Sequence, residues 1–361
     1  MGNEPSLEEL RAAIDALDDS ILDLILQRAE KASQVVKAKN IDPEQQDCYR
    51  PAREAQILRR LIDKNAGLLS DENIACIFRE IMSACLALQQ QLRIAYLGPA
   101  GTFTQTAALK HFGHAVKTGA FGSIDQVFRE VESGASHYGV VPIENSIEGV
   151  VNHTLDMLMN CSLSICGEVE LRIHHHLLSQ AESMDKVSRI YAHEQSFAQC
   201  RSWLDSHVQT AERIAVSSNA EGARRATEDN AAAAIAGDAA MEQYRLAKLA
   251  GNIEDEPDNT TRFLIIGRQP ASASGNDKTS LLFATDNKPG ALHRLLSCFA
   301  DNNVSMTRIE SRPSRRGMWD YVFFVDVEGH IEDERVRKSV RDLEEHASMV
   351  KLLGSYPRAV L

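Results

Sequence analysis

An apolar repeat at helical spacing, without a break, constrains the N-terminal part of this chain more than any other feature. Leu10, Ile14, Leu17, Ile21 and Leu24 follow one another at intervals of three or four residues. Ser6 and Glu9 form a capping box at the start, and the next helix breaker is Pro43. The pattern predicts a single helix over about 7–39. A helix this long is unusual inside one small domain, so we expect it to pack against a second copy of the chain.

Two further helices are predicted before residue 92. One carries REAQILRRLI, after the turn at Asp42-Pro43, and the other carries ENIACIFREIMSACLALQQQ, after Gly67 and the cap Ser70. No strand pattern interrupts them. Residues 1–92 are therefore expected to form an all-α domain.

At Arg93 the pattern changes to short apolar segments alternating with helical ones. The predicted strands are RIAYLG, HYGVVPIE, one long strand around SICGEVELRIHHHLLS, RIYAH, RIAVSS and AAAAIAG, and the predicted helices include TQTAALKHFG, SIDQVFREVESG and NSIEGVVNHTLDMLMN. This alternation predicts an α/β fold with a largely parallel sheet over 93–268. The region is long enough for two lobes. A chain that crosses between them and returns through TTRFLIIG would form a cleft, where small-molecule sites usually lie.

The last part of the chain predicts a small separate domain. Residues 269–278 are rich in Ser, Ala, Gly and Pro, which indicates a linker. The order βαββαβ follows over 279–361, which is typical of an α+β ferredoxin-like domain.

Composition excludes several classes of function. The formal net charge of −12 argues against nucleic acid as a partner, and no apolar stretch is long enough to span a membrane. The N-terminus lacks the apolar core of a signal peptide, and the seven cysteines lack metal-ligand spacing, so we expect a reducing, cytoplasmic location. His174 and His176 would share one face of a strand, but two histidines without a further ligand do not make a metal site. No metal or cofactor is expected.

Basic residues of the helical domain could form an anion site. Arg28 and Lys39 lie 11 positions apart, close to three turns, so they share a face of the long helix. Arg11 lies 17 positions from Arg28, about 100° off that face, and could join the site of a partner chain in an antiparallel helix dimer. Arg53 and Glu54 of the second helix and Gln89 of the third could close the cage. The alternative is that these charges are solvated helix faces.

The segment LRAAIDALDDSILDLILQRAEKASQVVKAK resembles the first helix of the all-helical chorismate mutases. The resemblance implies that chorismate is bound by Arg11, Arg28, Lys39, Arg53 and Glu54, and that Gln89 bonds the ether oxygen of the migrating group, with Lys39 and Gln89 as catalytic residues. The chemistry agrees, because a pericyclic rearrangement needs a dicarboxylate held in a compact conformer and a donor at the breaking C–O bond.

Two positions depart from that family's pattern. Arg50-Pro51-Ala52 stands where an Asp commonly precedes the Arg-Glu pair, and Cys85 stands where a Ser is common. Both departures concern the fine positioning of substrate.

The segment PDNTTRFLIIG (257–267) is either an ordinary turn before a buried strand or a site in which hydroxyls and a guanidinium are held by that strand. Together with YLGPAGTFTQTAA (96–108) and VVPIENSIEGVVNHTLDML (140–158), it resembles prephenate dehydratase. That family has two α/β lobes around a cleft, like periplasmic binding proteins, and the resemblance implies that Thr261 is catalytic.

Prephenate dehydration removes CO2 from the ring and the hydroxyl group from C4. We expect Thr261 to donate a hydrogen bond to the leaving oxygen, with Glu144 as the candidate carboxyl group behind it. Backbone N–H groups at Gly101-Thr102 and Asn145-Ser146, both before predicted helices, are suited to carboxylate binding. Arg262 either pairs with a substrate carboxylate or is structural. His193 and Gln195 are candidates only for lying in the cleft.

The C-terminal segment KPGALHRLLSCFADNNVSMTRIESRPSRRG resembles the ACT regulatory domain attached to prephenate dehydratases. The resemblance implies an L-phenylalanine site between paired domains, made by Gly290, Ala291, Leu292, Glu310, Ser311 and Arg312. The alternative is a turn-capped helix and a basic strand end. Bound phenylalanine would favour a less active state.

The three segments in this order resemble the bifunctional chorismate mutase–prephenate dehydratase family over nearly the whole chain. The resemblance implies conversion of chorismate to prephenate and then to phenylpyruvate, feedback inhibition by L-phenylalanine, and a homodimer or homotetramer. Two alternatives stay open: a dehydratase whose mutase domain has lapsed, and a non-catalytic amino-acid sensor. A sensor has no need of Thr261.

Overall fold

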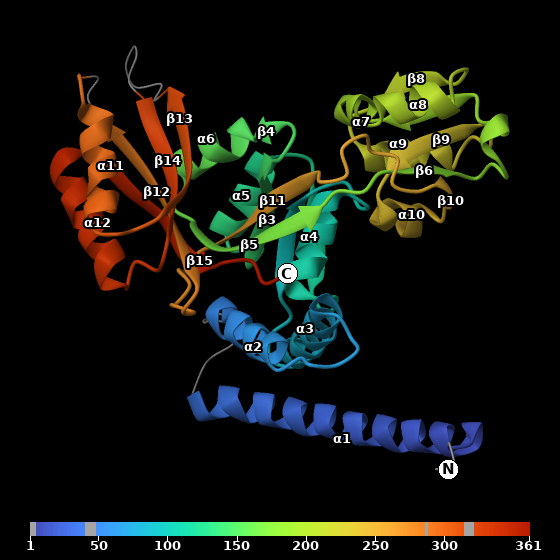
Figure 1. The fold of residues 1–361 in the computed structure, drawn as a ribbon, viewed down its shortest axis with the longest axis horizontal. Helices are drawn as coiled ribbons and strands as arrows, with labels where there is room; N and C mark the ends of the chain where they lie inside the picture. Colours follow the sequence, from blue (N-terminus) through green and yellow to red (C-terminus); the bar gives the residue numbers. More distant parts are fainter. Residues whose placement is uncertain (1–4, 40–47, 286–287, 314–320) are drawn as a thin grey trace.

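The computed structural model describes residues 5–39, 48–285, 288–313 and 321–361. The N-terminal part consists of α1 (Leu7–Lys39), α2 (Pro51–Asp63) and α3 (Asp71–Ala87), as predicted (Figure 1). Proline occupies the first turn of α2, where no backbone N–H is needed. The Ser70 hydroxyl accepts from the Asn73 N–H and caps α3.

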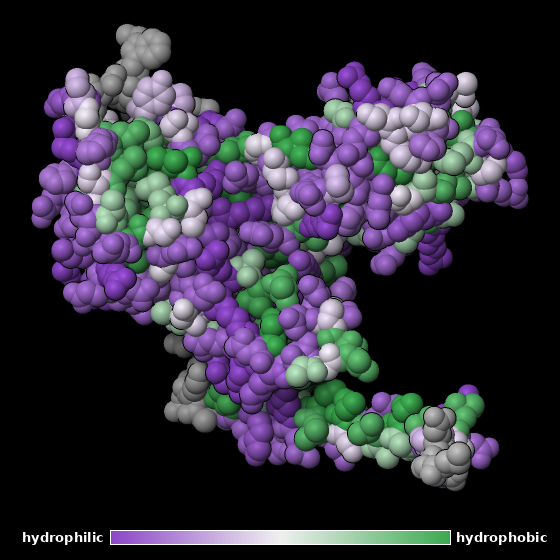
Figure 2. All heavy atoms as spheres, viewed as in Figure 1, coloured by the Kyte–Doolittle hydropathy of each residue, from purple (hydrophilic) through white to green (hydrophobic). Residues whose placement is uncertain are grey.

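Helix α1 is largely unburied along its length. It lies below α2 and α3 and extends well past them, and apolar residues show along it in the space-filling view (Figures 1 and 2). Its large exposed apolar residues are Leu7, Leu10, Ile14, Leu17, Ile21, Leu22, Leu24, Leu26 and Val35. A monomeric protein rarely exposes an apolar surface of this extent, so α1 has the composition of an interface helix.

The central region has two lobes, each with its own sheet. The first contains β1 (Arg93–Leu97), β2 (Lys117–Phe121), β3 (Tyr138–Asn145), β4 (Gly149–Val150), β5 (Ser164–Arg172) and β11 (Thr260–Gly267), with α4 (Phe103–Phe112), α5 (Ile124–Glu132) and α6 (Asn152–Asn160). Its strand order is β2-β1-β3-β11-β5, with β4 paired to β3. Strands β1, β2 and β3 are parallel, and β11 runs antiparallel between β3 and β5.

The second lobe is inserted between β5 and β11. It contains β6 (His176–Ser179), η1 (Met184–Lys186), β7 (Arg189–Ala192), α7 (Glu194–Gln199), α8 (Arg201–His207), β8 (Glu212–Ala215), α9 (Asn219–Ala226), β9 (Ala232–Ala236), α10 (Asp238–Tyr244) and β10 (Ala247–Ala250). Its strand order is β10-β6-β9-β7-β8. The chain therefore crosses at 173–175 and returns at 251–259, so the predicted two-lobed architecture is confirmed.

Two predicted elements of this region were wrong. The single strand expected around SICGEVELRIHHHLLS is two strands in different sheets, because residues 173–175 form the crossing between the lobes. The helix expected from Asn145 begins only at Asn152. A turn and the short strand β4 precede it, and Gly149 adopts a φ of 80° there, which favours glycine.

The C-terminal domain has the predicted ferredoxin-like order. Its elements are β12 (Asp277–Thr285), α11 (Ala291–Asp301), β13 (Met306–Pro313), β14 (Tyr321–Glu328), α12 (Glu334–His346) and β15 (Met349–Pro357). The strands are antiparallel in the order β13-β14-β12-β15, which leaves β13 at an edge.

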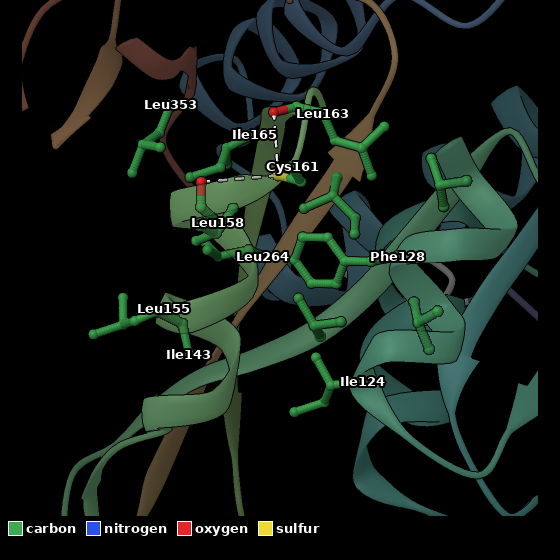
Figure 3. Close-up of a cluster of buried hydrophobic side chains, with 14 of the residues drawn as sticks. Ile124, Phe128, Ile143, Leu155, Leu158, Cys161, Leu163, Ile165, Leu264 and Leu353 are labelled. Atoms are coloured by element: carbon green, nitrogen blue, oxygen red, sulfur yellow. Dashed lines mark hydrogen bonds between the residues drawn. The ribbon is translucent and has the colours of Figure 1, made fainter. Parts of the chain in front are cut away.

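The C-terminal sheet shares a core with the first lobe. Figure 3 shows Leu353 of β15 beside the cluster formed by Phe128 of α5, Leu155 and Leu158 of α6, and Leu264 of β11. Strands β15 and β5 approach so closely that a Cβ on Gly354 would collide with the Ile165 backbone. The two domains are therefore packed as one body.

The helical domain also rests on the rest of the chain. The Tyr49 ring packs against Phe112 and Tyr138, and its hydroxyl lies 2.9 Å from Nε2 of His111. On α2, Arg59 donates to the Ser274 hydroxyl at 2.9 Å and to the Asn276 carbonyl at 2.9 Å. The segment predicted as a linker is thus held against α2.

Candidate active sites

Four of the residues predicted for an anion cage line one cavity between α1, α2 and α3. The cavity has a volume of about 220 Å³, and its lining includes Arg28, Arg53, Glu54 and Gln89. Arg50 and Cys85, the two departures from the family pattern, line the same cavity. The guanidinium groups of Arg28, Arg50 and Arg53 in a partly enclosed site suit a substrate with two carboxylates.

Glu54 and Gln89 occupy defined positions in this cavity. Burial raises the pKa of the Glu54 carboxyl to about 7, although Arg79, 4.0 Å away, and Arg28 act in the opposite direction. The Gln89 side-chain amide donates to the Ala32 carbonyl at 2.9 Å. Glu54 therefore changes charge near neutral pH, and Gln89 carries a donor at the cavity wall.

Arg11 and Lys39 were predicted for the same cage. Arg11 is exposed, and it is not among the residues that line the cavity. The Lys39 side chain lies outside the residues whose side chains the structure describes. A larger cavity of about 780 Å³ also includes Arg28, Arg53 and Gln89 and continues to Tyr138 and to residues 269–273.

The predicted dehydratase residues meet on strands β3 and β11. Thr261 pairs with Asn145 and Arg262 pairs with Glu144 in the antiparallel register. The Asn145 side-chain amide donates to Thr261 Oγ1 at 2.8 Å and lies 2.7 Å from Asn259 Oδ1. Because side chains alternate along a strand, Thr261 and Asn145 lie on one face and their neighbours on the other.

The orientation of the Asn145 amide is fixed by the backbone. Its Oδ1 accepts from the N–H groups of Ile147 and Glu148, both at 3.0 Å, and a backbone N–H can only donate. Nδ2 must therefore be the atom that faces Thr261, and the Thr261 oxygen accepts from it. The hydroxyl proton of Thr261 is left to be donated elsewhere.

The same polarity continues into the second lobe. Asn259, almost fully buried, donates from Nδ2 to Gln199 Oε1 at 3.2 Å, and His175 Nε2 lies 2.9 Å from that oxygen. Since Gln199 Oε1 can only accept, His175 carries its proton on Nε2. Burial lowers the pKa of His175, which keeps the ring neutral.

Gln199 closes the connection between the lobes, because its Nε2 donates to Glu148 Oε1 at 3.3 Å. Sequence reasoning missed Gln199, Asn259 and His175 as members of this network. Asn259 could have been found from its place beside the two threonines. Gln199 and His175 gave no signal, because only the fold brings them to β11.

Several expected backbone donors are already engaged. The Gly101 N–H donates to Gln105 Oε1 at 2.6 Å, and the Ser146 N–H donates to the Thr260 carbonyl at 2.9 Å. The expectation that Asn145-Ser146 precedes a helix was also wrong. Thr102 does cap α4, since its hydroxyl accepts from Gln105 N, so the N-terminus of α4 remains the better anion site of the two.

Glu144 and Arg262 face the C-terminal domain. Arg262 bonds Glu168 at 2.8 Å and Asp326 at 2.6 Å, and it donates to the Tyr356 hydroxyl. Of the two predicted roles for Arg262, these contacts favour the structural one. The Glu144 carboxylate is paired with Arg308 of β13 at 2.8 Å, so it does not stand behind the Thr261 hydroxyl.

The remaining predicted residues lie on separate elements. Gly290, with a φ of 75°, precedes α11, which begins with Ala291 and Leu292. Glu310, Ser311 and Arg312 lie on the edge strand β13. His193 caps α7, and its Nδ1 accepts from the Gln195 N–H.

Two further features concern metal binding and membrane insertion. No group of three or more His, Cys, Asp and Glu side chains in the described residues is placed to hold a metal ion. No helix within the same residues is long and apolar enough to cross a membrane.

Comparison with known proteins agrees with the order of these parts. Family models match at residues 10–90 (chorismate mutase type II), 94–271 (prephenate dehydratase) and 279–345 (ACT domain). A bifunctional chorismate mutase/prephenate dehydratase of Stutzerimonas stutzeri is 53% identical over 365 residues, covering 100% of both chains. The Escherichia coli K12 protein of the same name is 33% identical, covering 99% of this chain and 97% of that protein.

Among solved structures, prephenate dehydratase from Arthrobacter aurescens in complex with L-Phe superimposes with a TM-score of 0.69 at 34% identity. The match covers 75% of this chain and 93% of that one.

Proposed function

Because this chain belongs to the family of bifunctional chorismate mutase/prephenate dehydratases, we propose that the two polar clusters described above are its two active sites. The enzyme rearranges chorismate to prephenate and converts prephenate to phenylpyruvate. The cavity lined by Arg28 and Arg53 serves the first reaction. The network around Thr261 serves the second.

The mutase site works by holding its substrate. Arg28 and Arg53 bind the two carboxylates of chorismate, and Lys39 and the Arg11 of a second copy complete the cage. Gln89 turns its amide from the Ala32 carbonyl to the ether oxygen, where negative charge develops as the C–O bond breaks. A protonated Glu54 avoids repulsion with the dianion.

A dimer is part of this proposal. The apolar stripe of α1 needs a partner, and Arg11 is too far from Arg28 around the helix to serve the same site in its own chain. An antiparallel pairing of two α1 helices covers the stripe and brings each Arg11 to the other site. The assembly is a homodimer or a homotetramer.

The dehydratase step follows from the polarity of the Asn145 amide, which is the observation that carries this assignment. Thr261 donates a hydrogen bond through its free hydroxyl proton to the C4 hydroxyl of prephenate. As the C4–O bond breaks, the electron pair of the ring C–CO2 bond enters the ring and CO2 leaves. The departing hydroxide takes up one proton from solvent as water, and Thr261 keeps its own proton. Aromatisation drives the step, and Thr261 stabilises the leaving oxygen.

L-phenylalanine is proposed as the regulatory ligand of the C-terminal domain. The support is the family match to an ACT domain and the L-Phe complex of the Arthrobacter aurescens relative. Gly290–Leu292, Glu310 and Ser311 are the residues proposed to bind it, whereas the Arg312 side chain is held by Asp156 of the first lobe. A cytoplasmic location remains a prediction.

The decisive variant is Thr261→Val, which keeps the shape of the side chain and removes the hydroxyl. We expect dehydratase kcat to fall about 10²–10⁴-fold while the mutase rate on chorismate is unchanged. The matched control is Thr260→Val. Among the described residues, the Thr260 hydroxyl bonds just the Asp258 carbonyl, and the Thr260 backbone N–H donates to the Ser146 hydroxyl. The assay follows prephenate and phenylpyruvate from chorismate.

Equal rates for the two threonine variants would overturn the role of Thr261. A wild-type chain that consumes prephenate and leaves chorismate untouched would point to a lapsed mutase domain. A chain that binds these compounds and converts neither would be a sensor.

A further inference from the structure

One strand pair carries both the dehydratase network and a set of contacts to the C-terminal domain. Asn145 and Thr261 are cross-strand partners on one face of β3 and β11, and Glu144 and Arg262 are the next partners along. In an antiparallel pair, neighbouring positions point to opposite faces of the sheet. The second face is therefore one residue away from the reacting groups.

The ion pair between Glu144 and Arg308 joins this second face to strand β13. Arg308 Nε lies 2.8 Å from Glu144 Oε2, and the Arg308 side chain is only 12% exposed, whereas that of Glu144 is 38% exposed. Nη2 of Arg308 is buried and has no hydrogen-bond partner among the described residues. Arg308 therefore has a second buried donor, Nη2, with which it could bond Glu144 in a different geometry.

Arg262 makes a different kind of contact on the same face. Its guanidinium is fixed by Glu168, Asp326 and Tyr356, and Lys278 also bonds Glu168. This buried network lies above the core that the two domains share, so it holds them together. Arg308 lies on the edge strand of the C-terminal sheet, and it contacts Glu144 near the C-terminal end of β3.

Strand β13 is placed so that binding at its outer side can alter its contacts with the first lobe. It is the edge strand of its sheet, and its residues alternate: Arg308 and Arg312 are partly buried and bond the first lobe, while Thr307, Ile309 and Ser311 are exposed. A ligand or second domain on the outer side contacts the exposed set. Any resulting shift of β13 moves Arg308 with it.

We propose that Arg308 is a positioning residue of the dehydratase, which transmits the state of the regulatory domain through Glu144 to the Asn145–Thr261 hydrogen bond. The proposal rests on the proposed function and adds the route of regulation. Ligand binding on β13 changes the Arg308–Glu144 contact. Glu144 is covalently next to Asn145, so the amide that orients Thr261 shifts as well.

The test compares Arg308→Gln with the wild type as full-length chains. L-phenylalanine binding is measured by calorimetry, and dehydratase rates on prephenate are measured with and without saturating L-phenylalanine. We expect the variant to bind L-phenylalanine within about threefold of the wild type, yet to retain roughly tenfold more activity at saturation, which is a typical size for such coupling. Arg308→Lys should restore part of the inhibition, because it keeps a charge beside Glu144.

Two controls separate coupling from general damage. Arg358→Gln removes an exposed ion pair with Glu328 in the same domain and should leave inhibition unchanged. Adding Glu144→Gln to Arg308→Gln should cause no further loss of inhibition, because the two residues act as one contact.

Two results would overturn the route. One is full inhibition of Arg308→Gln, and the other is loss of L-phenylalanine binding by that variant, which would make Arg308 a ligand contact. If Arg308→Gln does not fold, Arg308→Lys replaces it in the test, and its inhibition must then lie below that of the wild type. A wild-type chain that L-phenylalanine does not inhibit would refute the proposed regulation itself, and the route with it.

Discussion

The Asn145 amide decides the direction in which hydrogen bonds run at the lobe junction. Two backbone N–H groups hold its oxygen, so its nitrogen must donate to Thr261. The same direction continues through Asn259 to Gln199 Oε1, which also accepts from His175 Nε2. A few uncharged side chains thus leave one hydroxyl proton available for the substrate.

Asn145→Asp tests this direction with almost no change of shape. The new carboxylate still accepts from the Ile147 and Glu148 N–H groups, but its second oxygen now accepts the Thr261 proton. We expect dehydratase kcat to fall about 10²–10³-fold, with KM changed much less. The comparison is Asn145→Ala, which leaves the Thr261 proton free. An aspartate variant clearly more active than the alanine variant would refute the inferred direction.

The raised pKa of Glu54 predicts the sign of a pH dependence in the mutase reaction. Burial raises its pKa to about 7, so the carboxyl group is neutral below that pH and charged above it. Because a carboxylate repels a dianionic substrate, kcat/KM for chorismate should fall as pH rises through 7. Glu54→Gln should give a flat profile over the same range, with dehydratase activity as the internal control. A fall of equal size in the Gln variant would assign the titration to another group.

At the scale of elements, helix α1 exposes an apolar stripe to water, and such a surface is normally covered by another protein surface. Leu17→Glu should convert the assembly to smaller species in light scattering and reduce mutase activity, while dehydratase activity on added prephenate persists. Asp19→Asn is the control, because Asp19 points to the roughly opposite side of the helix. An unchanged mass for Leu17→Glu would remove the α1 dimer.

The sequence predicted element types well where local pattern decides them. The periodicity of 7–39 and the βαββαβ order of the last domain were confirmed. The break at 173–175 was missed because apolar residues continue on both sides of it, and only the separation of the two sheets shows where one strand ends. Arg262 was ambiguous for a related reason: its partner Asp326 lies 64 positions away in another domain.

At the scale of the whole molecule, the domains are packed against one another and are not joined by linkers alone. Tyr49 and Arg59 hold the helical domain against the rest, and the first lobe and the C-terminal domain share buried side chains. A displacement of one domain is therefore passed to its neighbours through packed side chains, which transmit movement better than a flexible linker does.

Leu353→Ala tests how far the shared core unites the two domains. Leu353 is 2% exposed, and its truncation should cost about 2–5 kcal/mol of unfolding free energy. Calorimetry should show the first lobe and the C-terminal domain shifting together to lower temperature. The control is Leu352→Ala on the opposite face of β15, where the side chain is 44% exposed and the expected change is under about 0.5 kcal/mol. A shift confined to one domain would mean that they unfold independently.

The alternation of faces along β3 and β11 also limits how this gene can vary in length. Deleting or inserting a single codon within either strand would exchange the two faces, turning Arg262 toward the substrate and Thr261 toward the buried carboxylates. Reaction and regulation would fail together, although no chemical group had been lost. In a library of short insertions and deletions, functional clones should therefore be depleted of single-codon changes across 138–145 and 260–267, while such changes accumulate in the exposed loops.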